Sequence, residues 1–448
     1  MKKRRLNHSL IVLLIGLLLF TNLGLSVLAQ ENAKDPIILN FWWERTAFVD
    51  EAKESVIDAF NETHPNIKVS MNVLGGGDEY LRSVKAGLTA GKEGPDMFRI
   101  FGPSAMIPFA GAGLLLNLNK YADKYDWNEK IPSWALEIHT YKGNLYGLPL
   151  NPESLFLYYN KNKFEEYGWS VPKTYSELVA LCEKIEAKGY IPFSFGTRGF
   201  TPANEWWLSV ILNQWAGSEN VYKVLTGTLP LTDESFKKAL ENFKFIWDKG
   251  WIMNKKMYEV SEDDSFARFA DETALMLMSG SWGVKYMDKY VEDFKWGIAP
   301  FPSGDDIVPV SPLAIGFTVG VNVATEHPDA VAEFLNWLVE DPKRSALIAV
   351  NTWTDVWPIT TSDPSPYFTD DMDERVSWMI SYIYTIQKEG RIGYATWAFW
   401  PTKTQVYMYE NLSNVLFGSL SIDDYLSKAQ KLLVKAREEG EIPAMPKR

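Results

Sequence analysis

The stretch from Tyr146 to Asn160, YGLPLNPESLFLYYN, constrains the fold of this chain more than any other part of the sequence. Its apolar, extended pattern is interrupted at Asn151-Pro152-Glu153-Ser154 and resumes at Leu155. Because proline cannot donate a hydrogen bond within a sheet, it marks the edge or the end of a strand. We therefore predict that the chain leaves one packed unit here and enters a second one. Glu153 would then lie at the mouth of a cleft between two lobes, where ligands usually bind.

The length of the chain supports this division. At 448 residues the chain exceeds what a single hydrophobic core usually serves, so two or more domains are expected. Aromatic residues make up 14% of the sequence and include 18 tryptophans, which is more than packing alone requires. Some of these rings are therefore expected to have a second role.

The N-terminus carries the features of a secretory signal. The basic residues Lys2 to Arg5 precede the apolar run Leu10 to Phe20, and Val27-Leu28-Ala29 supplies the small residues that a signal peptidase accepts. We predict that residues 1–29 are a signal peptide, cleaved before Gln30. An uncleaved membrane anchor is the alternative, because the apolar run approaches the length of a membrane span.

The single cysteine, Cys182, lies at helical spacing from Leu178, Leu181 and Ile185, so we expect a buried core thiol. One cysteine excludes a disulfide within the chain, and its position far from the signal excludes lipid attachment through an N-terminal cysteine. We therefore expect a periplasmic protein that is free of the membrane. We also expect a monomer.

The net charge of −12 argues against one class of partner. An acidic surface repels phosphate backbones, so nucleic acid is not expected to bind. The histidines, which are His8, His64, His139 and His327, do not show the spacing of metal ligands. We expect neither a metal nor a cofactor.

From Pro36 onwards, strand-like and helical patterns alternate. Strand-like stretches at 37–43, 67–73 and 95–101 are separated by segments with apolar residues at helical spacing. This order predicts an α/β fold in which a parallel sheet is covered by helices. Because ligands of such sheets bind beyond the carboxyl ends of the strands, we expect the segments Trp43 to Thr46 and Phe101 to Ser104 at the site.

Two later stretches, Trp296 to Pro302 and Asn351 to Pro358, predict further crossings between the lobes. The N-terminal lobe would comprise residues 36–150 and 300–350, and the C-terminal lobe residues 151–299 and 351–448. Each lobe is expected to be a mainly parallel sheet flanked by helices. A body of this kind opens and closes as a hinge about its extended strands.

A series of motifs occurs in the order ILNFWW, FNETHPNIKVSM, EYLRSVKAGLTAGKEGPDMF, GAGLLLNLNKY, YKGNLYGLPLNPESLFLYYNKNKFEEYGWSVPKTYSELV, ALMLMSGSWG, WGIAPFPSG and AVAEFLNWLV. In order and approximate spacing they resemble family 1 of the extracellular solute-binding proteins, the sugar receptors of ABC importers, which includes the maltodextrin-binding type. The resemblance extends from about Pro36 to the C-terminus. It implies a type II periplasmic binding protein fold, with two α/β lobes joined by hinge strands, which captures a carbohydrate and delivers it to a membrane permease.

The resemblance also implies roles for individual residues. Glu153 stands where sugar-binding relatives place a carboxylate against sugar hydroxyls, and Trp282 and Trp400 stand where relatives place aromatic platforms. Glu44 and Arg45 follow the first strand, where relatives use polar side chains. The segment from Phe101 to Ser104 departs from the maltodextrin type, so maltose itself is not implied as the ligand.

A sugar site needs flat apolar surfaces for the faces of the ring and carboxylates or amides for its hydroxyls. The complete set of predicted ligand-binding residues is Trp43, Glu44, Arg45, Glu153, Glu205, Trp206, Trp207, Trp282, Trp353, Asp355, Trp357, Trp397 and Trp400. For the tryptophans the alternative is packing in a core or hinge, and stacking on a ligand is favoured for Trp282 and Trp400. Alternatively, Glu153 caps the hinge turn, and Arg45 pairs with Glu44 or with a surface acid.

A secreted glycoside hydrolase is the enzymatic alternative, with Glu44 and Glu153 as its carboxylate pair. The crossing motif and the SGSW motif are instead typical of the receptors. We therefore predict a protein that is not an enzyme and that binds a mono- or oligosaccharide. Its partners would be the transmembrane subunits of an ABC permease.

Overall fold

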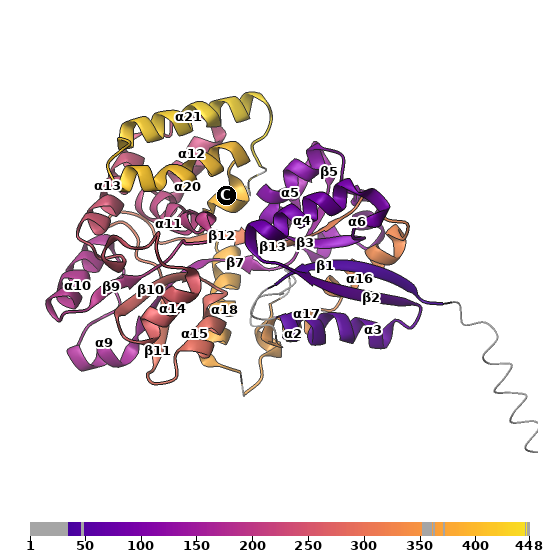
Figure 1. The fold of residues 1–448 in the computed structure, drawn as a ribbon, viewed down its shortest axis with the longest axis horizontal. Coiled ribbons are helices and arrows are strands. Elements are labelled where there is room, and N and C mark those ends of the chain that lie inside the picture. Colours follow the sequence, from indigo (N-terminus) through magenta and orange to yellow (C-terminus); the bar gives the residue numbers. More distant parts are fainter. Residues whose placement is uncertain are drawn as a thin grey trace, which may run out of the picture.

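The computed structural model describes residues 35–45, 49–351, 361, 363–370, 372–443 and 445. These residues form two lobes that lie side by side, with a small third sheet between them (Figure 1). The predicted signal peptide, residues 1–29, lies outside the described residues.

The first lobe is built on a five-stranded sheet. Its strand order is β2 (Ile67–Leu74), β1 (Ile37–Glu44), β3 (Met97–Phe101), β13 (Phe317–Val321) and β6 (Gly147–Pro149). A short hairpin joins β4 (Thr140–Tyr141) to β5 (Asn144–Leu145). The helices of this lobe are α2 (Val49–Ala52), α3 (Ala59–Thr63), α4 (Gly77–Thr89), α5 (Gly102–Gly111), α6 (Asn119–Lys124), α7 (Trp127–Lys130), α8 (Ser133–Glu137), α16 (Pro328–Val339) and α17 (Pro342–Asn351).

The second lobe is built on a four-stranded sheet. Its strand order is β11 (Trp296–Pro300), β8 (Leu155–Asn160), β10 (Ala274–Gly280) and β9 (Ile191–Ser194). The helices of this lobe are α9 (Lys161–Tyr167), α10 (Tyr175–Ala187), α11 (Asn204–Val210), α12 (Ser218–Thr226), α13 (Glu234–Asp248), α14 (Glu262–Ala270), α15 (Gly283–Tyr290), α18 (Glu374–Lys388), α19 (Thr396–Phe399), α20 (Thr402–Leu416) and α21 (Ile422–Glu438). Cys182 is buried in α10, as predicted, and Thr174 caps this helix.

Both sheets are mixed, which corrects the prediction of mainly parallel sheets. In the first, β1 runs parallel to β2 and β3, but β13 runs antiparallel to β3 and β6. In the second, β9 and β10 are parallel, and β8 is antiparallel to both of its neighbours. The reason is that β8 and β13 receive the chain just after it has crossed the cleft. A strand that enters a sheet from the cleft runs against the strands that end there.

The stretch from Tyr146 to Asn160 crosses between the lobes, as predicted. Between β6 of the first sheet and β8 of the second lies β7 (Pro152–Glu153), which pairs with β12 (Ser311–Ile315). β12 also pairs with β14 (Ile392–Tyr394), and these three strands form the small sheet between the lobes.

The chain returns to the first lobe at Gly316, between β12 and β13. The predicted return at Trp296 to Pro302 is wrong, because most of this segment forms β11 and pairs with β8 on the second sheet. The first lobe therefore resumes at Phe317 and not at residue 300. Apart from Asn351, the predicted third crossing at Asn351 to Pro358 lies outside the described residues.

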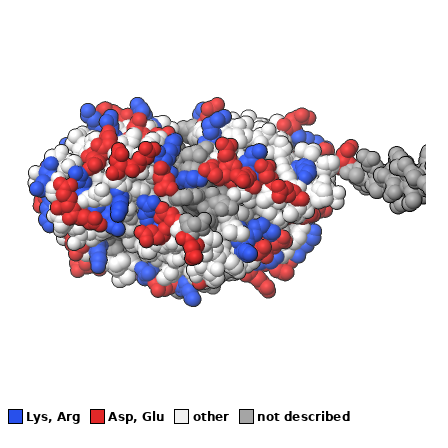
Figure 2. Space-filling view, turned by 90° about the horizontal axis from the view of Figure 1, so that it is seen from below, with Lys and Arg blue, Asp and Glu red and all other residues white. Residues whose placement is uncertain are grey.

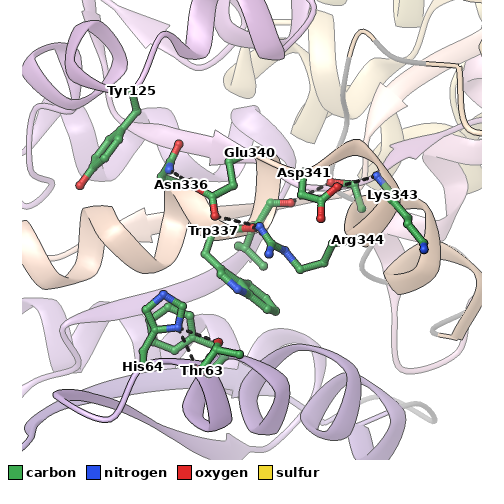
Figure 3. Close-up of polar contacts among 12 residues, drawn as sticks. Thr63, His64, Tyr125, Asn336, Trp337, Glu340, Asp341, Lys343 and Arg344 are labelled. Carbon is green, nitrogen blue, oxygen red and sulfur yellow. Dashed lines mark hydrogen bonds and ion pairs between the residues drawn. The ribbon is translucent and has the colours of Figure 1, made fainter.

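Arg344 holds the turn between α16 and α17 (Figure 3). Its Nε and Nη2 atoms donate to the carbonyl oxygen of Trp337 over 3.0 and 2.6 Å, and Nη2 also donates to Glu340 Oε1 over 3.0 Å. The guanidinium lies over the Trp337 ring, 4.3 Å from its centroid. A cation at this place satisfies a carbonyl group near the end of a helix. Trp337 is buried in the core, so this corner anchors α17 to the first lobe.

Acidic and basic side chains are interspersed over the face shown in Figure 2. In the part of the chain that the structure describes, none of the helices combines the length and the apolar character that crossing a membrane requires.

Candidate ligand-binding cleft

A cavity of about 550 Å³ opens between the two lobes. The first lobe contributes the ends of β1 and β3 and the starts of α4 and α5, and the second contributes residues of α11, α14, α15 and α20. The volume falls within the range of about 300–1,000 Å³ that is usual for small-molecule sites. The cavity lies beyond the carboxyl ends of β1 and β3, where the strand order predicts a site.

Glu153 lies on the crossing strand β7 and lines this cavity. Its side chain is buried, and Oε1 accepts a hydrogen bond from Asn151 Nδ2 over 3.0 Å. Asn151 Oδ1 in turn accepts from the backbone nitrogen of Phe317 over 3.0 Å. Gly316 lies against the carboxylate, since a Cβ atom at Gly316 would overlap it. Both crossing strands therefore hold the carboxylate of Glu153 at the cavity wall.

Glu44 and Arg45 reach the same cavity from the end of β1. Glu44 is buried, and its Oε1 accepts a hydrogen bond of 2.7 Å from the backbone nitrogen of Gly77 at the start of α4. The partial positive charge at the start of a helix stabilises a carboxylate in this position. Arg45 is exposed at the rim.

Glu205 is the second residue of α11 and also lines the cavity. Its Oε1 accepts a hydrogen bond from Gln405 Nε2 over 2.8 Å. Burial raises the pKa of Glu205 to about 8, and the hydrogen bond from Gln405 opposes this shift only in part. At neutral pH the group is therefore mostly a neutral carboxylic acid, which can donate as well as accept a hydrogen bond.

Three of the predicted tryptophans, Trp206, Trp282 and Trp397, line the cavity. The rings of Trp206 and Trp282 have centroids 4.9 Å apart and planes inclined by 58°. The ring of Trp282 occupies space that Gly280, at the end of β10, leaves free, because a Cβ atom there would overlap the indole. The second lobe thus presents an aromatic surface to the cavity.

The sequence patterns did not single out Glu262, which also lines the cavity. Its Oε1 accepts a hydrogen bond from Trp282 Nε1 over 2.9 Å. Burial raises the pKa of Glu262 to about 7; the bond from Trp282 opposes the shift, and the charges of Asp263 and Glu44 add to it. In the sequence, Glu262 is one of three acids in the first turn of α14, a pattern typical of any helix start. Nothing in that pattern distinguishes it from Asp263 or Asp264.

Two other predicted tryptophans lie in the interior, which corrects their assignment to the site. Trp43 is 1% exposed and packs under the guanidinium of Arg99, whose Cζ is 4.7 Å from the ring centroid. Successive residues of a strand point to opposite faces, so Trp43 points away from the side that Glu44 occupies. Trp207 is 0% exposed and packs edge-on against Phe193. It points away from the cavity because neighbouring helical residues project about 100° apart.

Trp400 is a third correction, since it is 0% exposed and does not line the cavity. Trp397, three residues earlier in α19, faces the cavity instead. The remaining predicted residues, Trp353, Asp355 and Trp357, lie outside the described residues.

Within the described ranges, no group of three or more His, Cys, Asp or Glu side chains is arranged to hold a metal ion. His139 is buried, and its Nε2 lies 2.6 Å from Thr318 Oγ1. This histidine thus has a structural partner within the first lobe.

Among the described residues, polar contacts join the lobes across the cleft. Lys285 Nζ on α15 forms an ion pair of 2.6 Å with Glu51 Oε1 on α2. Thr402 Oγ1 on α20 donates to the carbonyl oxygen of Ser104 on α5 over 3.2 Å. Because the partners in each contact belong to different lobes, the contacts favour a closed arrangement over an open one.

Two sheets joined by crossing strands, with a cavity at the crossing, define a two-lobed protein whose cavity is lined by both lobes. Proteins of this class bind solutes by closing around them. The chain belongs to the bacterial extracellular solute-binding proteins, whose family model matches residues 45–344.

Relatives with curated names support this membership. The multiple sugar-binding protein of Streptococcus mutans is 25% identical over 327 residues, which are 69% of this chain and 73% of the relative. The maltotriose-binding protein of Pyrococcus abyssi is 27% identical over 265 residues, which are 58% of this chain and 54% of that protein.

Solved structures confirm the two-lobed α/β fold. A chitin oligosaccharide binding protein has a TM-score of 0.72 at 22% identity, covering 90% of this chain and 100% of that one. A structure from a study of xylan utilization by Caldanaerobius polysaccharolyticus has a TM-score of 0.73 at 20% identity, covering 88% of this chain and 100% of that one.

Membership of this family decides two of the predictions. The family consists of solute-binding proteins and not of enzymes, so the glycoside hydrolase alternative is set aside. The family is extracellular, which places the protein in a periplasmic or extracellular location.

Proposed function

We propose that this protein captures a carbohydrate, most simply an oligosaccharide, in the cleft between its lobes and delivers it to the permease of an ABC importer. One observation carries the proposal: the cavity combines the rings of Trp206, Trp282 and Trp397 with the carboxyl groups of Glu44 and Glu153. The first lobe and the hinge supply these carboxyl groups, and the second lobe supplies the rings.

The two kinds of side chain match the two kinds of surface on a sugar. The faces of a pyranose ring carry C–H groups that pack on an indole, and its rim carries hydroxyls that donate to carboxylates. Glu205, as a neutral acid, can donate to a sugar oxygen, which a carboxylate cannot do. The cavity therefore offers acceptors, a donor and flat apolar surfaces.

The names of the relatives agree with this proposal but do not choose one ligand. Relatives carry names that refer to multiple sugars and to maltotriose, whereas the Brucella abortus relative, 24% identical over 315 residues, is an sn-glycerol-3-phosphate-binding protein. A phosphate would meet the carboxylates of Glu44 and Glu153, with the exposed Arg45 at the rim. Like charges repel, so a neutral sugar fits this cavity better than a phosphate.

Closure follows from the same geometry. A sugar that contacts both lobes binds the closed state more tightly than the open one and shifts the population towards it. In this proposal the mature protein begins after residue 29, acts as a monomer in the periplasm and docks on the permease in its closed form. It binds neither nucleic acid nor a cofactor.

The proposal is tested by titrating the purified protein with maltotriose, xylotriose, N,N′,N″-triacetylchitotriose and sn-glycerol 3-phosphate. Calorimetry and intrinsic tryptophan fluorescence are expected to show saturable binding of at least one trisaccharide, which is recovered intact by mass spectrometry. Binding of sn-glycerol 3-phosphate without any trisaccharide would overturn the carbohydrate assignment. Recovery of shortened sugars would overturn the proposal that the protein is a receptor.

Replacing Trp282 with alanine is expected to weaken trisaccharide binding at least about tenfold, because one stacking surface is lost. The melting temperature should fall by only a few degrees, since this ring is half-buried at the cavity. Trp207→Ala is the matched control, because it removes a neighbouring but fully buried ring and should cost about 3–5 kcal/mol of stability. Intact affinity in Trp282→Ala would remove this ring from the site.

The ion pair between Lys285 and Glu51 is expected to favour closure slightly. Lys285→Met should weaken trisaccharide binding about threefold, because partly exposed pairs contribute less than about 1 kcal/mol. Small-angle scattering of the ligand-free protein should show a larger radius of gyration. Lys289→Met on the same helix is the control, since Lys289 is exposed and its ammonium group lies over the ring of Tyr290 in the same lobe. Equal effects of the two substitutions would argue against the cross-cleft role.

A further inference from the structure

The indole of Trp282 makes one side-chain hydrogen bond that fixes its plane. Trp282 Nε1 donates to Glu262 Oε1 over 2.9 Å, and the two residues come from different segments, the turn between β10 and α15 and the start of α14. Rotation of the indole about its side-chain bonds would break this contact. The edge of the ring that carries nitrogen is therefore tied to the wall of the second lobe.

Packing holds the rest of the ring. Gly280 leaves space for the six-membered part of the indole, and Trp206 lies beside it with ring centroids 4.9 Å apart. These contacts are apolar and allow the ring to slide, whereas the bond to Glu262 is directional. The orientation of the aromatic surface thus depends on one polar contact.

The capping of α14 does not explain the contact that Glu262, its first residue, makes with Trp282. The N-terminus of α14 is already capped. The Ser261 hydroxyl accepts a hydrogen bond from the backbone nitrogen of Asp264, and the Asp264 carboxylate accepts one from the backbone nitrogen of Ser261. Asp264 also pairs with Arg198 over 2.6 Å. Glu262 is half-buried at the cavity. Withdrawing a carboxyl group from water is unfavourable unless it is well bonded, so its contact with Trp282 needs a separate reason.

We propose that Glu262 is a positioning residue of the ligand site, which sets the plane of the Trp282 indole against the sugar by accepting the hydrogen bond from Nε1. This inference rests on the proposed function, since it concerns the same cavity. It adds a role that acts through Trp282 and does not require Glu262 to touch the sugar. A preset ring avoids the loss of side-chain freedom that a loose ring would suffer on binding.

Double-mutant cycles test the proposal with maltotriose, xylotriose and N,N′,N″-triacetylchitotriose as probes. Glu262→Leu removes the acceptor with a side chain of similar size. It is expected to weaken the affinity for the trisaccharide that binds about tenfold. Trp282→Phe keeps an aromatic ring without the N–H donor, and in that background Glu262→Leu should change affinity by less than about twofold. An equal loss in both backgrounds would overturn the proposal, because Glu262 would then act on the sugar directly.

Two further variants guard against a trivial result. Glu262→Gln keeps an oxygen that can accept from the indole, so affinity should stay within about threefold of the native protein. A loss as large as that of Glu262→Leu would show that charge matters and not the acceptor, and would overturn the proposal. Asp263→Asn is the matched control, because this neighbouring acid is exposed and should change affinity by less than about twofold.

A measurement without sugar separates this inference from the proposed function. In a two-dimensional nitrogen–proton spectrum, the indole resonance of Trp282 is identified by its absence in Trp282→Phe. It should shift with pH with a midpoint near 7, following Glu262, and this shift should be absent in Glu262→Gln. The charges of Asp263 on its own helix and of Glu44 from the first lobe raise the pKa of Glu262 further. Arg45, Glu153 and Glu205 line the same cavity, and the pKa of Glu205 is about 8. A pH-independent resonance would overturn the contact, whatever ligand the cleft binds.

Discussion

Gly316→Ala is expected to reduce trisaccharide affinity about a hundredfold. A Cβ atom at Gly316 would overlap the carboxylate of Glu153, and the backbone at this point cannot retreat. The Gly316 nitrogen donates to the Asn151 carbonyl and its own carbonyl accepts from the Gly102 nitrogen, each over 2.9 Å. The carboxylate must therefore leave its place, and two hydrogen bonds from sugar hydroxyls to a charged group would be lost.

The fold should survive this substitution, because the displaced group is the end of a flexible side chain. A cost of about 1–3 kcal/mol is expected from urea unfolding. Gly111→Ala in α5 is the control, since its Cβ would lie 3.5 Å from Tyr141 Oη, an ordinary contact. Native affinity in Gly316→Ala would show that Glu153 does not hold the sugar.

Glu205→Gln is expected to stabilise the protein strongly at alkaline pH and hardly at all at pH 5. The pKa of Glu205 is about 8 in the folded protein against an ordinary value of 4.5. The folded state therefore binds this proton more tightly than the unfolded state does. The stabilisation is complete below pH 4.5 and is lost as the pH rises through 8. The loss is on the order of 4 kcal/mol, which the glutamine variant avoids.

Urea unfolding at several pH values between 5 and 8.5 measures this difference. The glutamine keeps an oxygen for Gln405 Nε2, so the local hydrogen bond survives. The variant should retain part of the pH dependence, because burial also raises the pKa of Glu262, to about 7. Glu241→Gln, at an exposed position of α13, is the control and should follow the native curve. Parallel curves for Glu205→Gln and the native protein would contradict the raised pKa.

Much of the fold was predictable because it depends on the types of neighbouring residues in the sequence. Pro152 interrupts the apolar pattern between β6 and β8, and proline has the same effect on a strand in any context. The return crossing was not predictable in the same way. β11 ends at Pro300, yet all of it pairs with β8. A proline at the end of a strand therefore does not show whether the chain crosses to the other lobe there or stays on the edge of the same sheet.

The candidate site shows the same division. Glu44 follows one predicted strand and Phe101 ends another, and the rule that ligands bind beyond such ends placed both at the cavity. Trp206 and Trp207 could not be separated, because every residue of α11 is buried and no polar face indicates its orientation. Glu262 could not be found at all, since its partner Trp282 lies 20 residues away and meets it only in the folded lobe.

The sequence by itself determined the family, the alternation of strands and helices, and the crossing at Pro152 and Glu153, because each depends on short-range patterns of residue type. The tertiary structure decided which tryptophans face the ligand cavity and which acids are buried there. Those properties depend on how helices from distant parts of the chain turn against one another. The carboxylate of Glu153 is held at the cavity wall because the returning strand places Gly316, more than 160 residues further along the chain, against it.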